Sequence, residues 1–98
     1  MRAPIGNTII DKIDGTNVLK PIAVNFYRTE SGLIEAHPPA LGLIMGGLGH
    51  NNEDALSDLK EYILTYRTRA DEFNQANATP YAIAVAKAIK DHVELLTA

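Results

Sequence analysis

The side chains best suited to acid–base chemistry are the three histidines, at positions 37, 50 and 92. His37 follows Glu35 with one residue between them, a spacing that places both side chains on one face of an extended strand. An imidazole and a carboxylate on one face could act as an acid–base pair. No nucleophile or electrophile motif lies near this pair, so a small hydrolase remains an alternative, which retained function in His37→Ala would exclude.

Metal, thiol and cofactor chemistry have little support in the sequence. No two histidines are four residues apart on a predicted helix, and no acidic residue stands at a recognisable metal-ligand spacing from them. The chain has no cysteine, which excludes a disulfide scaffold, a thiolate metal site and a cysteine nucleophile. We therefore expect no catalytic site, no metal and no cofactor.

A glycine-rich segment, residues 46–49 (GGLG), leads into a predicted helix. Free N–H groups at a helix N-terminus attract anions, so Gly47 and Gly49 are candidate anion-binding residues. The segment lacks the lysine of a phosphate-binding loop and the G-x-G-x-x-G spacing. Glu53 and Asp54 would also repel an anion there. A structural turn from strand to helix is the simpler interpretation.

The composition indicates one folded domain, covering residues 1–98. Of the 98 residues, 46% are apolar and 21% charged, which is typical of a globular protein. A core of this size is thin, so oligomerisation would help. The net charge of −3 argues against nucleic acid as the main partner. The apolar run 40–48 is far shorter than the roughly 20 residues that span a bilayer, and no apolar leader is visible, so we expect a cytoplasmic protein.

Residue types predict an antiparallel sheet. Residues 22–27 and 33–36 are rich in apolar and β-branched side chains, and a polar connection ending in Gly32 joins them into a hairpin. Asp14-Gly15 is a hairpin signal that would pair residues 8–13 with 16–19, unless this segment is a loosely ordered arm. Residues 41–48 would form a further strand, weakened by glycines.

Two helices follow. The first is predicted over 52–73, with Asn51 as its N-cap and apolar residues at spacings of three and four. The second is predicted over about 80–96, within a C-terminal segment of 79–97, because Thr79-Pro80 is a favourable helix start. Its apolar residues occupy more than one face, which predicts packing partly against another copy of the chain, or completion of the same core. The predicted class is α+β: a three- or four-stranded antiparallel sheet packed on one main helix, plus a C-terminal helix.

Residues 22–67 resemble the HicB family of antitoxins, whose N-terminal domain is a reduced ribonuclease-H-like fold. The similarity is in the order of the strand IAVNFY, the turn ending in Gly32, the strand LIEAHP, the segment PALG and the helix start GHNNEDALSDL. Residues 8–19 precede the usual start of the family domain, and Asn51 replaces its more typical threonine or serine cap. The roughly 20 residues from Thr79 onward are too few for the DNA-binding domain that such antitoxins commonly carry, so operator binding is not expected.

The resemblance implies a stand-alone antitoxin that neutralises a HicA-type mRNA-cleaving toxin by occluding it. The exposed residues expected to bind this partner are His37, Pro38, Pro39, His50 and Asn51. The alternative is a mobile-element protein that blocks host defence by binding a defence protein or by sequestering a nucleotide signal, which the turn at 46–49 motivates.

Overall fold

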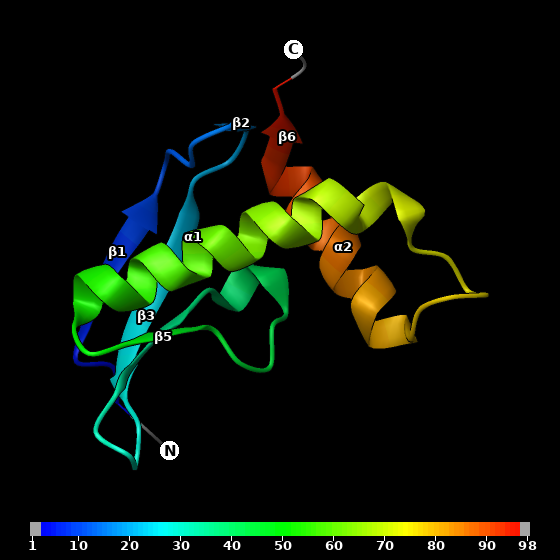
Figure 1. The fold of residues 1–98 in the computed structure, drawn as a ribbon. Helices are drawn as coiled ribbons and strands as arrows, with labels where there is room; N and C mark the ends of the chain where they lie inside the picture. The colour runs from blue at the N-terminus through cyan, green and yellow to red at the C-terminus, as the bar shows by residue number, and fades with distance from the viewer. Residues whose placement is uncertain (1–2, 97–98) are drawn as a thin grey trace.

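A computed structural model describes residues 3–96, which form an α+β fold built on a four-stranded antiparallel sheet. Its strands run in the order β1-β3-β4-β5 and span, in that order, Gly6–Ile10, Ile22–Arg28, Ile34–His37 and Gly47–Gly49. Helix α1 (Asn52–Arg69) lies across one face of this sheet (Figure 1). The predicted fold class is therefore confirmed, with four strands in the main sheet.

The β3–β4 hairpin forms where the sequence predicts it. Gly32 has a φ of 85°, which glycine adopts at little cost, and its N–H donates to Thr29 O at 3.0 Å. Asn25 lies opposite His37 and Arg28 opposite Ile34, which fixes the register. Every second residue from Ile22 to Phe26 is buried, so one face of β3 belongs to the core.

Helix α1 also begins where predicted. The side-chain oxygen of Asn51 accepts the Asp54 N–H at 2.8 Å, a cap that contributes about 1 kcal/mol. Ala55, Leu59 and Ile63 are fully buried against the sheet. The predicted helix to residue 73 is too long, because α1 ends at Arg69 and the chain tightens into the 3₁₀ turn η2 (Ala70–Glu72).

The predicted pairing of residues 8–13 with 16–19 is wrong. Strand β1 pairs with β3, and β2 (Thr16–Val18) pairs with β6 (Val93–Leu95) at the other end of the chain. The turn itself forms, with a φ of 82° at Gly15. A turn signal specifies a local bend and not the strand partners. Both Ile10 and Ile13 are buried in the core.

The C-terminal helix α2 (Pro80–His92) starts as predicted and ends earlier. Thr79 Oγ1 accepts the Ala82 N–H at 3.1 Å, with Pro80 in the first turn. Beyond His92 the chain is extended, because Val93 becomes fully buried in the ribbon with β2. The predicted extension to residue 96 is wrong, and residue 97 lies outside the described residues. Helix α2 packs against α1, η1 (Pro39–Leu41), η2 and β6.

The predicted strand over residues 41–48 is wrong for most of its length. The proline pair favours the 3₁₀ turn η1, and Gly42 ends that turn with a φ of 71°. A loop follows, and only Gly47–Gly49 pairs with β4. Leu41 and Leu43 are both buried, so this irregular segment belongs to the core although it is not a strand. Within residues 3–96, no helix is long and apolar enough to cross a membrane.

Candidate functional site

The sheet face opposite α1 carries side chains of mixed chemistry. Strand pairing places them in rows across the strands: Tyr27, Glu35 and Leu48; Asn7, Asn25 and His37; Ile9 and Ala23. The rings of Tyr27 and His37 meet edge to face, with centroids 6.3 Å apart. Glu35 and His37 therefore share a face, as their spacing predicts.

His37 and Glu35 both bind the backbone of the loop that follows η1. His37 Nε2 donates to Leu43 O at 3.0 Å, and Glu35 Oε2 accepts the Gly46 N–H at the same distance. Glu35 is only 6% exposed. These two contacts position the backbone of the loop.

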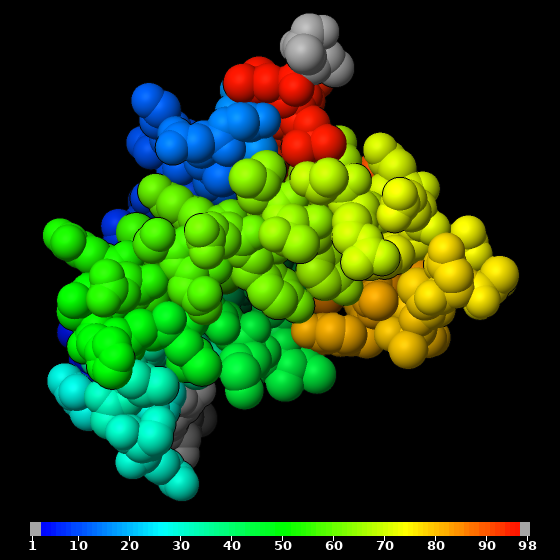
Figure 2. Space-filling view, viewed as in Figure 1, coloured from blue at the N-terminus to red at the C-terminus, as the bar shows by residue number. Residues whose placement is uncertain are grey.

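A third contact fixes the Leu43–Gly46 loop from α2. The Ile44 N–H donates to the hydroxyl of Tyr81 at 3.0 Å, and the Leu43 side chain is buried beneath. The loop backbone is thus held at Leu43, Ile44 and Gly46. The side chains of Ile44 and Met45 point outward and are 80% and 61% exposed. Figure 2 shows this segment, in blue-green, at the surface between the β3–β4 turn and the start of α2. Exposed apolar side chains on a fixed backbone are typical of a protein-binding surface.

A shallow hollow of about 400 Å³ adjoins the two exposed side chains. It lies between the loop and the β3–β4 turn, and its lining residues are Thr29, Ser31, Leu33, Glu35, Ile44, Met45 and Leu48. Apolar side chains form most of the loop side, and hydroxyl groups form the turn side. The hollow could receive one apolar side chain of a partner while the hydroxyls bind polar atoms around it.

Replacing Tyr81 with phenylalanine should loosen the loop without unfolding the protein. The substitution removes the hydroxyl that accepts the Ile44 N–H and leaves the ring, so we expect a loss of about 1 kcal/mol in the free energy of unfolding. Amide hydrogen exchange measured by NMR should accelerate at Ile44. Tyr62→Phe, on α1 and 44% exposed, is the control; equal exchange at Ile44 in both variants would contradict the proposed role of Tyr81.

The structure separates the predicted partner-binding residues into two groups. His37 and Pro39 lie at the loop end of β4, although Pro38 is fully buried. His50 and Asn51 are exposed at the opposite end of β5, where Gly49 pairs with Ile34. The sequence predictions missed Ile44, Met45 and Tyr81. The available signal was that Gly42 and Gly46 enclose the three apolar residues 43–45, a pattern more typical of a loop than of a strand.

Gly47 and Gly49, the candidate anion-binding residues, allow β5 to approach the α1 backbone closely. A Cβ on Gly47 would lie 2.3 Å from Ala55 O, and one on Gly49 would lie 2.4 Å from the Ala55 nitrogen. Between them, the Leu48 N–H donates to Asp58 Oδ2 at 2.9 Å. Close packing of the two backbones accounts for both glycines. The N–H of Leu48, between them, is already bonded to the Asp58 carboxylate.

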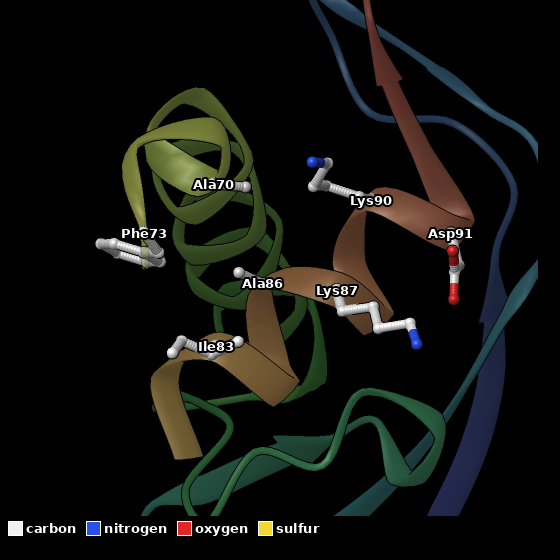
Figure 3. A pocket seen from close by; sticks show the side chains of 7 residues that line it. All are labelled: Ala70, Phe73, Ile83, Ala86, Lys87, Lys90 and Asp91. Carbon is white, nitrogen blue, oxygen red and sulfur yellow. The ribbon is translucent and has the colours of Figure 1, made fainter. Parts of the chain in front are cut away.

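A second hollow, of about 300 Å³, lies between the end of α1 and α2 (Figure 3). Phe73 and Ala70 line one side and Ile83 the other, with lysines at the rim. Lys90 Nζ lies 2.7 Å from Asp71 Oδ1, and this contact holds the pKa of Asp71 below its ordinary value. The Lys90–Asp71 ion pair therefore links α2 to η2. Within residues 3–96, no group of three histidine or acidic side chains could hold a metal ion.

Comparisons with protein-family models, with curated proteins and with solved structures gave no match.

Proposed function

We propose that this protein is a non-catalytic binding protein, resembling a stand-alone HicB-like antitoxin, that neutralises a HicA-type mRNA-cleaving toxin by covering its active surface. One observation carries the proposal: the Leu43–Gly46 loop is held by Glu35, His37 and Tyr81 while Ile44 and Met45 face solvent. In this proposal the protein acts in the cytoplasm, where such a toxin would meet its mRNA substrate.

The energetics of association favour this loop as a contact surface. A binding segment that is already ordered loses less conformational entropy on association than a mobile one. Burial of the apolar surface of Ile44 and Met45 would stabilise a complex by about 25 cal/mol for each Å² removed from water. The methionine side chain also adapts its shape to irregular surfaces. The adjoining hollow gives the partner a place to insert a side chain of its own.

The polar groups beside the loop support a role without catalysis. His37 donates to Leu43 O, and Glu35 accepts from Gly46, so each side chain has a positioning role on this face. A general acid–base pair needs instead to reach a substrate proton at hydrogen-bond distance. This arrangement favours occlusion of a partner over the alternative of a small hydrolase.

Co-expression tests the proposal directly. Cells that make a HicA-type toxin should recover growth when this protein is made with it, and the toxin should co-purify with a tagged copy. The control is the same vector carrying an unrelated protein of similar size. Absence of both growth recovery and a complex would remove the antitoxin proposal.

The same exposed pair also supports the alternative in which a mobile element uses this protein to bind a host defence protein. The version in which it sequesters a nucleotide signal has less support, because Gly47 and Gly49 face the α1 backbone closely. Glu53 and Asp54 also place negative charge at that helix start.

A further inference from the structure

Strand β1 forms one edge of the sheet, and its outer side is available for pairing. In the sheet order β1-β3-β4-β5, β1 has a neighbour on one side only among the described residues. Alternate residues of such a strand direct their N–H and C=O groups away from the sheet. These groups bind either water or the backbone of another strand.

Within β1 itself, this edge lacks two of the features by which proteins usually prevent strand addition. The five residues of β1, GNTII, include no charged residue and no proline. Ile9 is 62% exposed on the face opposite α1, and Ile5, just before the strand, is 50% exposed. Ile5 is a bend residue outside the strand, and its N–H, which donates to Phe26 O at 2.7 Å, holds it beside β3.

The exposed residues of this edge are self-complementary. Positions 5, 7 and 9 are Ile, Asn and Ile, which reads the same in both directions about Asn7. An interface with two-fold symmetry brings the same surface of both subunits together, so a symmetric pattern matches itself. This symmetry favours a second copy of the chain over an unrelated strand.

Helix α2, by contrast, has used much of its apolar surface inside its own subunit. Val85, Ala86 and Ile89 are buried. The sequence pattern predicts self-association through α2, but this helix completes the core of its own subunit. The β1 edge is therefore the better surface for a second copy.

We propose that β1 pairs antiparallel with β1 of a second copy about a two-fold axis at Asn7, joining two four-stranded sheets into one. In this register Ile5 lies opposite Ile9 of the partner subunit, and the pair occurs twice. Such cross-strand apolar pairs are the main source of stability between strands. Asn7 faces its own copy, and side-chain amides carry both donors and acceptors for a mutual hydrogen bond.

The absence of cysteine makes the register testable by cross-linking. Residues directly opposite on antiparallel strands have Cα atoms about 4.5–5.5 Å apart, within the range that a disulfide spans. Asn7→Cys should therefore form an intersubunit disulfide under mild oxidation, seen as a doubled mass on non-reducing gels. Ile44→Cys, at a residue that is 80% exposed but lies in a loop outside β1, should cross-link much more slowly at the same concentration.

Light scattering after gel filtration tests the dimer itself. The unmodified protein should have twice its 10.6 kDa mass. Ile9→Lys should raise the dissociation constant about 100-fold, because each dimer loses two apolar pairs and places two unpaired ammonium groups against apolar side chains. Ile5→Lys should act alike. Leu19→Lys, the same kind of change at an exposed residue outside β1 and the loop, should leave the mass unaltered.

A monomeric mass for the unmodified protein at about 100 μM would overturn the proposal. The dissociation constant of the dimer would then exceed about 100 μM, which is weaker than that of most specific interfaces. A dimer that survives both lysine variants, with no preferential Asn7→Cys cross-link, would overturn it too. Circular dichroism of each variant verifies the fold. The experiment uses no toxin, so it is independent of the proposed function.

Discussion

Replacing Gly47 with alanine is expected to lower the free energy of unfolding by about 3 kcal/mol, a large part of what holds a small domain folded. The added Cβ would lie 2.3 Å from Ala55 O and 2.4 Å from the Leu59 nitrogen. Both atoms belong to the α1 backbone, which cannot turn aside as a side chain can. The helix would have to move away from β5, and Leu59 would lose its packing. Urea unfolding followed by circular dichroism measures the loss.

Gly6→Ala is the matched control, because it makes the same chemical change in another strand of the same sheet. Its Cβ would meet the Asn52 side chain and the Phe26 ring at 3.8 Å each, an ordinary contact distance. We expect a change within about 1 kcal/mol, of either sign. If Gly47→Ala proved as mild as Gly6→Ala, β5 would not depend on close contact with α1.

The elements predicted correctly are those whose signals lie within a few residues. The Asn51 cap, the turn at Gly32 and the buried positions Ala55, Leu59 and Ile63 each follow from local spacing or side-chain type. Strand partners do not follow in this way. The pairing of β2 with β6 joins residues 17 and 94, and no local pattern at either end identifies the other.

The candidate site shows the same division. The spacing of Glu35 and His37 correctly predicts a shared face, because that depends only on the strand period. The loop that they hold depends on Tyr81, which lies 37 residues beyond Ile44. Residues 41–48 are apolar enough for a strand, but burial of Leu41 and Leu43 and the proline pair before them favour a turn and a loop. The exposure of Ile44 and Met45 is therefore a tertiary result.

Changing Ile44 and Met45 together to aspartate is expected to abolish neutralisation of the partner without unfolding the protein. The two side chains are 80% and 61% exposed, and the bonds that hold the loop come from its backbone, so the folded state tolerates the change. In a complex, however, two carboxylates would lose water without gaining a partner. We expect the dissociation constant to rise at least about 100-fold, as for central interface residues. Calorimetry with the purified toxin and growth in the co-expression assay measure the effect.

Leu19→Asp is the control for this pair, because it adds a carboxylate at another exposed apolar residue, 51% exposed and located just after β2. It should rescue growth as well as the unmodified protein does. If the loop variant also rescued growth, binding would have to use another surface, such as the exposed His50 and Asn51 at the far end of β5. If both variants failed, the loss would reflect net charge and not contact, since the chain already carries −3. Only failure of the loop variant alone would assign occlusion to Ile44 and Met45.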